Sequence, residues 1–184
     1  MKRKIVILAF AMALIALSVG GTLAYFTQEE TTHNIITTGS VKIELIEKAV
    51  VNGKQIDFED VDGVLPGSAV SKIVTVENVG ASGAYVRVSV RPGITLAGGG
   101  QGDPDLIGFD FNLTDWTDGG DGWWYYNSSL EAGDTTKALF TTVTFDSKMN
   151  NQYQGCTCEV DVTVQAVQTA NNGDSALKAS GWPK

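Results

Sequence analysis

Hydrophobic and polar residues alternate with a period of two along most of the chain from Val41 onward. This alternation is typical of strands with one buried face, because successive side chains of a strand point to opposite faces of the sheet. It predicts strands over residues 41–45, 70–77, 86–91, 107–113, 139–145 and 156–167. The last segment has the clearest pattern, and its expected core-facing residues are Cys156, Cys158, Val160, Val162, Val164 and Ala166.

Turn signals separate these segments. Asn52-Gly53 predicts a two-residue hairpin, since both central positions of that turn require positive φ. Leu65-Pro66-Gly67 and the glycines at 80 and 83 bracket the strand at 70–77. Helical patterns after the N-terminus are limited to a single turn near 103–106 or between 128 and 132. The many short strands predict an all-β protein in which residues 39–170 form a two-sheet β-sandwich.

One part of this domain, near 92–127, is rich in glycine, aspartate and aromatic residues. We expect it to be an insertion or long loop, the usual place of variable surface function. It ends in the aromatic run Trp123, Trp124, Tyr125 and Tyr126, which could stack on a sugar or, as the alternative, pack within the sandwich. The final residues, 171–184, are polar and are expected to form a loose C-terminal tail.

Three aspartates in this region follow one another at intervals of three residues. Asp115, Asp118 and Asp121 offer the carboxylate oxygens that Ca²⁺ prefers, so a calcium site is one hypothesis. The spacing differs from that of an EF-hand loop, and solvated acidic turns are the alternative. No other cofactor is predicted.

Residues 1–24 have the three parts of a secretory signal peptide. Lys2, Arg3 and Lys4 precede an apolar run over residues 5–19, and Thr22 and Ala24 are small residues suited to a cleavage site. We predict cleavage between Ala24 and Tyr25 and a secreted protein that keeps no membrane segment. The apolar run is shorter than the roughly 20 residues that span a bilayer, although a retained anchor is the alternative.

The charge balance excludes several functions. The chain has 13 Lys and Arg against 21 Asp and Glu; removing the three basic residues at positions 2–4 leaves 10 against 21, a net charge of −11. Nucleic-acid binding is not expected, because phosphate contacts need clustered basic residues. His33 is the only histidine, which excludes a zinc site built on two or three histidines. We predict no catalytic residue and no enzyme, with a carboxylate-based or metal-dependent hydrolase as the alternative.

The two cysteines form a C-x-C pair. On a strand they share one face, and a disulfide closing so short a loop would be strained. We therefore expect Cys156 and Cys158 to pack as small apolar residues.

Three segments resemble the TasA and camelysin (CalY) family of exported bacterial proteins, which includes subunits of biofilm matrix fibres. They are GTLAYF with ITTGSVKIEL, LPGSAVSKIVTVENVGASGAYVRVSV, and YQGCTCEVDVTVQAV. The positions that match the family pattern are Gly21, Thr22, Ala24, Phe26, Gly39, Pro66, Gly67, Glu77, Asn78 and Gly80. Residues 92–150 match poorly.

The resemblance implies a jelly-roll-like sandwich, export with signal processing, and polymerisation into fibres in the extracellular matrix or at the cell surface. In fibre-forming relatives the processed N-terminal segment becomes a strand of the next subunit. The metalloprotease label given to camelysin-type members fits poorly with a single histidine, and the resemblance contributes no catalytic residue here.

Residues 25–38 suit such a donor strand. They have no hairpin partner, yet they contain apolar residues that a monomer would bury; the expected interface residues are Tyr25, Phe26, Thr27, His33, Ile35 and Ile36. Adding this segment to a neighbour's sheet edge would satisfy main-chain hydrogen bonds, and the head-to-tail contact would propagate into a filament. The alternatives are that the segment folds onto its own sandwich, or that the protein is a monomeric secreted binding module for carbohydrate or surface ligands. An accessory or anchoring subunit is a further expected partner.

Overall fold

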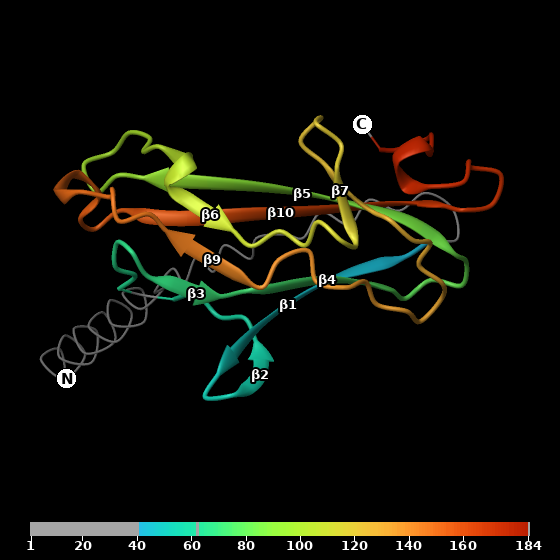
Figure 1. Cartoon of the computed structure of the whole chain (residues 1–184), viewed down its shortest axis with the longest axis horizontal. Coiled ribbons are helices and arrows are strands. Elements are labelled where there is room, and N and C mark those ends of the chain that lie inside the picture. The colour runs from blue at the N-terminus through green and yellow to red at the C-terminus, as the bar shows by residue number, and fades with distance from the viewer. Residues whose placement is uncertain (1–40, 62, 184) are drawn as a thin grey trace, which may run out of the picture. The chain divides into compact units, whose positions relative to one another are not determined.

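The computed structural model describes residues 41–61 and 63–183. These residues belong to the larger of the chain's two compact units, His33–Lys184. They form ten strands and three short 3-10 helices, so the all-β prediction is confirmed for this part of the chain (Figure 1). The elements are β1 (Ile43–Val51), β2 (Lys54–Asp57), β3 (Ala69–Ser71), β4 (Ile73–Asn78), β5 (Ala84–Thr95), η1 (Pro104–Leu106), β6 (Ile107–Phe109), β7 (Trp116–Asp118), β8 (Trp124–Tyr126), β9 (Thr142–Phe145), η2 (Asn151–Tyr153), β10 (Thr157–Gln168) and η3 (Ala176–Lys178).

Two of the three antiparallel sheets continue into each other and form one layer. Their strand orders are β2-β1-β4 and β3-β9-β6. β3 and β4 follow each other directly, and the chain that precedes β9 runs beside β4. The backbone N–H of Lys72 donates to Thr141 O at 3.0 Å and that of Val74 donates to Phe140 O at 3.1 Å. These hydrogen bonds join the two sheets without a break.

The second layer has the strand order β10-β5-β8-β7. β5 and β10 are each 12 residues long and pair along their whole length, from Ala84 opposite Gln168 to Thr95 opposite Thr157. β8 pairs with β5 only at Arg87 and Val88, so the far half of β5 has β10 as its only strand partner among the described residues. The region expected to be an insertion therefore supplies β6 to one layer and β7 and β8 to the other.

The core lies between these layers. Its most completely buried side chains are Val41, Ile43, Val74, Val76, Val86, Val88, Ile94, Trp116, Leu139, Phe140 and Val164. Within β5 and β10 the core residues have even numbers, which is the parity that the alternation predicts. Trp116 is 1% exposed on the edge strand β7, and its indole N–H donates to Lys137 O at 3.0 Å.

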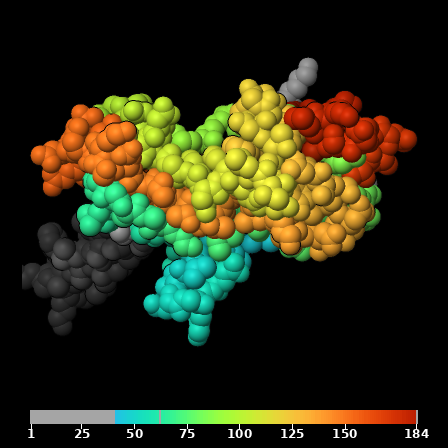
Figure 2. Space-filling model, viewed as in Figure 1, coloured from blue at the N-terminus to red at the C-terminus, as the bar shows by residue number. Residues whose placement is uncertain are grey.

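The predicted turns are present. Asn52 and Gly53 have φ of 52° and 77° and join β1 to β2. Gly67 has φ of 78°, and the Ser68 N–H donates to Leu65 O at 3.1 Å to close the turn. The β1–β2 hairpin stands out from the sandwich and exposes nearly half of Val50, Val51 and Ile56 (Figure 2).

Two local predictions are wrong. The strand expected over 107–113 ends at Phe109, because Asn112 Oδ1 accepts the N–H groups of Thr114 and Asp115 and closes a turn that leaves Leu113 exposed. The segment 128–132 contains no helical turn; Leu130 pairs with Ala84 there in an isolated antiparallel bridge. The single turn near 103–106 is confirmed as η1.

Candidate assembly edge

β10 is the outermost strand of its sheet in the part of the chain that the structure describes. Its N–H and C=O groups on the side facing β5 are paired, while those on the other side have no strand partner among the described residues. An edge of 12 residues is long, and a long open edge is a template for another strand. We call this unpaired side of β10 the β10 edge.

The side chains beside this edge are only half covered. Val164 and Ala166 are buried, but Cys158, Val160 and Val162 on the same face of β10 are half-buried against the core. Opposite Val162 in the register stands Val90 of β5, which is half-buried too. The layers are therefore less well closed towards the start of β10.

β1 lies in the facing layer and contacts β10. β2 pairs with β1 only from Lys48 to Val51, so Ile43 to Glu47 have a strand partner on the β4 side alone among the described residues. Leu45 points towards the core and is half-buried. Both layers thus present open edges on the same side of the sandwich, with a strip of half-buried apolar residues between them: Leu45, Val90, Cys158, Val160 and Val162.

The cysteine pair is part of this region. Both thiols are free and half-buried against the core, and their Sγ atoms lie 3.8 Å apart. Burial, together with the hydrogen bond and the charge of Cys156, raises the pKa of the Cys158 thiol to about 11. Cys158 therefore keeps its proton at neutral pH.

The aromatic run has its side chains on two faces. Trp124 and Tyr126 point into the core, where Trp124 stacks on Phe111 with ring centres 4.2 Å apart. Trp123, just before β8, and Tyr125 of β8 lie on the side away from this core, beside Arg87 of β5. The aromatic run is therefore divided between two faces, and Tyr125 is itself only 5% exposed, within a second cluster that includes Trp182.

Arg87 is the centre of that outer face. Its guanidinium donates to Gln165 Oε1 at 2.6 and 2.9 Å and to the Tyr125 hydroxyl at 3.1 Å. The guanidinium carbon lies 4.3 Å from the ring centre of Trp123 and 4.5 Å from that of Trp182. Contacts between a guanidinium and two indole rings contribute about 0.5–2 kcal/mol each, so Trp182 attaches the C-terminal segment to the sheet.

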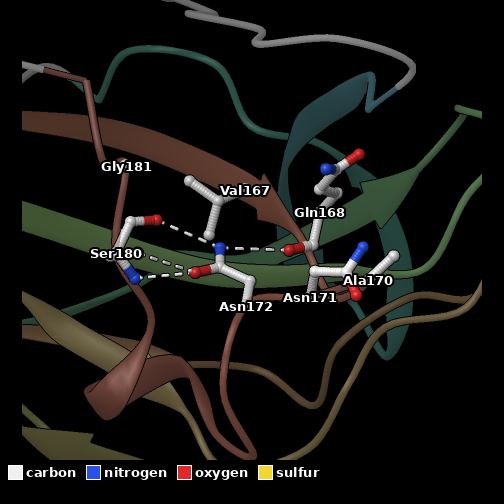
Figure 3. A pocket seen from close by; sticks show the side chains of 7 residues that line it. All are labelled: Val167, Gln168, Ala170, Asn171, Asn172, Ser180 and Gly181. Carbon is white, nitrogen blue, oxygen red and sulfur yellow. Dashed lines mark hydrogen bonds between the residues drawn. The ribbon is translucent and has the colours of Figure 1, made fainter.

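The C-terminal residues differ from the loose tail expected from their composition. Asn172 Nδ2 donates to the carbonyls of Gln168 and Ser180, and its Oδ1 accepts the Ser180 N–H at 2.8 Å (Figure 3). Ala176 is 2% exposed beneath this turn. A hollow of about 340 Å³ beside Asn172 is lined by the residues of this turn. The Asn172 side-chain amide that borders it already donates and accepts hydrogen bonds within the turn.

The three aspartates proposed to bind calcium each have donors within the protein. Asp115 accepts from Asn112 Nδ2 at 2.9 Å, and Asp118 accepts the Gly120 N–H at 2.9 Å. Asp121 accepts from the Tyr125 hydroxyl at 2.7 Å, and this hydrogen bond, which outweighs the opposing effect of burial, lowers the pKa of the Asp121 carboxyl. They occupy separate positions along the β7–β8 hairpin and the turn before it.

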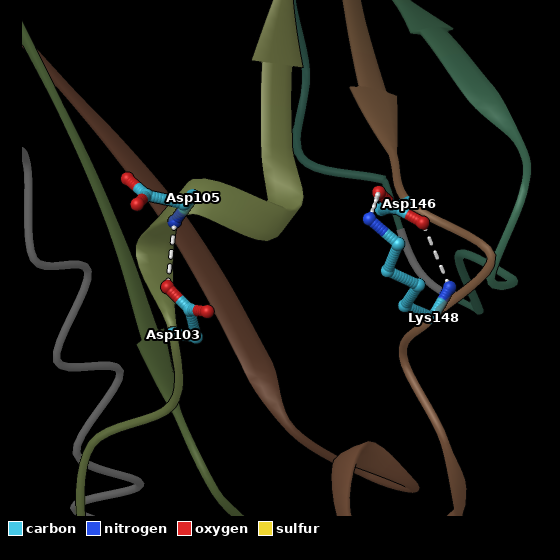
Figure 4. A network of polar contacts seen from close by, with 4 residues as sticks. All are labelled: Asp103, Asp105, Asp146 and Lys148. Atoms are coloured by element: carbon cyan, nitrogen blue, oxygen red, sulfur yellow. Dashed lines mark hydrogen bonds and ion pairs between the residues drawn. The ribbon is translucent and has the colours of Figure 1, made fainter.

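Other acidic turns are similar. Asp103 Oδ1 accepts the Asp105 N–H at the start of η1, and Asp146 accepts the Lys148 N–H while its other oxygen faces the lysine ammonium (Figure 4). Among the described residues no group of three or more His, Cys, Asp or Glu side chains is placed to hold a metal ion. The described residues therefore contain no preformed carboxylate cluster that supports the calcium hypothesis.

The predicted signal peptide, the Ala24–Tyr25 cleavage site and the expected interface residues Tyr25, Phe26, Thr27, His33, Ile35 and Ile36 lie outside the described residues. No helix in the described ranges is long and apolar enough to cross a membrane.

Two residues of the family pattern have clear structural roles. Asn78 is fully buried; its Oδ1 accepts the Gly80 N–H at 3.0 Å, and its Nδ2 donates to the carbonyls of Ser82 and Leu130 at 2.8 Å each. Gly67 occupies the left-handed position of the turn before β3, and its N–H donates to Phe145 O. These residues fix the loops at both ends of the segment that contains the consecutive strands β3 and β4.

Comparison with protein families agrees with the resemblance seen in the sequence. Residues 1–89 match the model of a family described as camelysin metallo-endopeptidase. This similarity to the TasA/camelysin family covers the first 89 of the chain's 184 residues. The matched residues include β1 to β4, and therefore Leu45, and the first part of β5. β10 lies outside the match. Neither curated proteins nor solved structures gave a match.

Sequence reasoning missed two parts of this site. The alternation places Cys158, Val160 and Val162 in the core, but it carries no information on how completely the opposite layer covers them. The cluster around Arg87 was missed because Trp182 is far from it along the chain. A tryptophan within an otherwise polar C-terminal segment was the available signal.

Proposed function

We propose that this protein is an exported structural subunit that polymerises into extracellular fibres, in a biofilm matrix or at the cell surface, by N-terminal donor-strand exchange. In this proposal residues 25–38 of one subunit, freed by cleavage after Ala24, add to the β10 edge of the next. The observation that carries the proposal is the β10 edge, 12 residues long and without a strand partner among the described residues, with its half-buried apolar strip.

An added strand would supply two things that this side of the sandwich lacks among the described residues. Its main chain would pair with the N–H and C=O groups of the β10 edge. Its alternate side chains would cover Val160, Val162 and Leu45, which are half-buried. Tyr25, Phe26, Ile35 and Ile36 are the apolar side chains available in the donor segment.

The contact joins two different surfaces of the subunit. Such head-to-tail contacts generate filaments when the rotation from one subunit to the next does not close a ring. Before cleavage the donor segment is attached to the signal peptide, which would prevent premature assembly. An accessory subunit could start or anchor the fibre by offering either surface.

Electron microscopy of the protein beginning at Tyr25 tests the proposal. Filaments are expected, and deletion of residues 25–38 should abolish them while circular dichroism still reports a folded β protein. Persistently monomeric protein over a range of pH and salt would contradict the proposal and favour a monomeric secreted binding module for carbohydrate or surface ligands. In that case added calcium should raise the melting temperature if Asp115, Asp118 and Asp121 bind it, because a ligand of the folded state stabilises that state.

A matched pair of variants locates the accepting edge. Val162→Lys places a charge on the half-buried face of β10, whereas Thr157→Lys places the same charge on its exposed outer face. The first should suppress filaments and the second should leave them. Equal filament formation by two folded variants would show that strands add elsewhere.

A further inference from the structure

The thiol pair at the start of β10 suggests a redox reaction. Cys156 and Cys158 are both free, and their sulfur atoms are in contact at 3.8 Å. The pair is half-buried, so a small oxidant can reach it from solvent. We propose that Cys156 and Cys158 form a reversible intramolecular disulfide, and that this bond shortens the β10 edge available to an added strand. The second half of this inference rests on the proposed function; the disulfide itself does not.

The backbone permits the bond because the two cysteines are held differently. Cys158 lies inside β10, opposite Ile94 of β5. Cys156 precedes the strand, and its N–H donates to Tyr153 O in the turn that follows η2. The residue before it, Gly155, has φ of 70°, so the chain leaves the strand direction just before Cys156. Cys156 can therefore move towards Cys158 while the pairing beyond Thr157 is kept.

The reaction is a two-electron oxidation. Each thiol loses one proton and one electron, and the two sulfurs form the new bond. With a hydroperoxide as oxidant, a first thiol attacks the peroxide to give a sulfenic acid and one hydroxyl product; the second thiol then displaces water from the sulfenic sulfur. With hydrogen peroxide the products are the disulfide and two waters.

The strain in this bond makes it reversible. The ring spans a single intervening residue, Thr157, and an extended strand holds residues i and i+2 about 6.6 Å apart, near the upper limit for a disulfide. Strained disulfides are reduced more readily than structural ones. Exchange with a small thiol should therefore restore both cysteines.

Ring closure must also distort the first residues of β10. Thr157 pairs with Thr95 at the end of the sheet, and it lies inside the closed ring. The N–H and C=O of Thr157 face Thr95, so the last groups at this end of the β10 edge are those of Cys158. Drawing Cys156 towards Cys158 turns the main chain within the ring and displaces these Cys158 groups from the β10 edge. An added strand would lose its pairing at this end.

The first arm of the test measures the disulfide on the full chain. The protein is treated with hydrogen peroxide, denatured, and its free thiols are counted, with non-reducing electrophoresis to detect covalent dimers. We expect both thiols to disappear together in a monomer and to return with dithiothreitol. Cys156→Ala and Cys158→Ala are the controls, and neither should form the intramolecular disulfide, which intact mass of the wild type detects as the loss of two hydrogen atoms. Loss of both wild-type thiols without that change in mass, or covalent dimers as the main product, would overturn the disulfide.

The second arm measures filament growth by reduced and oxidised protein. Oxidised protein should elongate about tenfold more slowly, the effect of losing roughly one main-chain hydrogen bond per added subunit. The Cys156→Ala variant should grow at one rate in both conditions. Equal growth of reduced and oxidised wild type would overturn the effect on the edge. Absence of filaments from the reduced protein would instead contradict the proposed function, and the thiol count would still decide the disulfide.

Discussion

Lys72 Nζ lies 2.8 Å from a carboxylate oxygen of Glu47, and the lysine side chain is only 7% exposed. Lys72 separates β3 from β4, and Glu47 belongs to the neighbouring strand β1. The ammonium group also lies 3.8 Å from the centre of the Phe58 ring, which covers the pair from the side of the β1–β2 hairpin. This buried ion pair therefore joins the strand junction to β1.

Removing one partner should destabilise the protein strongly. Lys72→Ala leaves the Glu47 carboxylate, which is 19% exposed, without its counter-charge, and we expect a loss of about 3 kcal/mol in the free energy of unfolding. Replacing both residues by apolar ones, as in Glu47→Leu with Lys72→Met, should restore most of that loss, because no unpaired charge remains buried. Denaturant unfolding measures all three proteins.

The exposed ion pair between Lys48 and Asp57 on the β1–β2 hairpin serves as the control. Lys48→Ala should cost less than about 1 kcal/mol, because exposed ion pairs contribute little. If Lys48→Ala and Lys72→Ala lower the free energy of unfolding by similar amounts, burial does not make the Lys72–Glu47 pair more important than an exposed one.

The strand pattern and the hairpin at Asn52-Gly53 could be predicted from sequence because each depends on neighbouring residues. The end of β6 could not, since Asn112 accepts two backbone N–H groups and turns the chain before Leu113, although the alternation continues. The β10 edge depends on which strands of the other layer lie opposite Val162, and that information is not local. The Arg87 cluster requires a contact with Trp182, which no periodic pattern encodes.

Asp110 gives the connection after β6 a pH-dependent contribution to stability. Its carboxylate accepts the N–H groups of Thr141 and Thr142 and the Thr141 hydroxyl. Burial alone would raise the pKa of Asp110, but these hydrogen bonds outweigh it and the pKa is lowered. The stabilisation is therefore complete above the unfolded-state pKa of about 3.9 and is lost as the pH falls through the lower folded-state value.

We expect Asp110→Asn to cost about 1 kcal/mol at pH 7, because hydrogen bonds to a charged acceptor become bonds to a neutral one. The difference from wild type should shrink as the pH falls below about 4. Thermal melts of both proteins between pH 2 and 7 would measure it. A constant difference over that range would contradict the role of the ionised carboxylate.

Trp182 should determine whether the C-terminal segment stays on the sheet. Its ring contacts Arg87 and stands edge-on to Tyr125, with ring centres 5.8 Å apart. Trp182→Ala should speed amide hydrogen exchange throughout residues 171–183 and lower stability by about 1–3 kcal/mol, because a cation–π and an aromatic contact are lost together. Leu177→Ala, at a side chain that is 54% exposed, should change neither quantity appreciably. Equal effects of the two variants would show that the segment is held by other contacts.

Variants of Asn78 test whether its side chain is enclosed by carbonyl groups, because the stability of an aspartate there should depend on pH. Its amide Nδ2 donates to the carbonyls of Ser82 and Leu130 at a fully buried position. Asn78→Ala leaves these carbonyls without a donor and should cost about 2–3 kcal/mol at any pH.

Asn78→Asp instead directs a carboxylate at the two carbonyls, so burial and repulsion should raise the folded-state pKa of the new acid above its usual value of about 3.9. A raised pKa means that the acid is tolerated when protonated and destabilising when charged. The Asn78→Asp protein should therefore become less stable relative to wild type as the pH rises from 4 to 8, whereas the cost of Asn78→Ala stays constant, and denaturant unfolding at several pH values distinguishes the two. If Asn78→Asp shows the same cost at every pH, the side chain at position 78 is not enclosed by carbonyl groups as the structure describes.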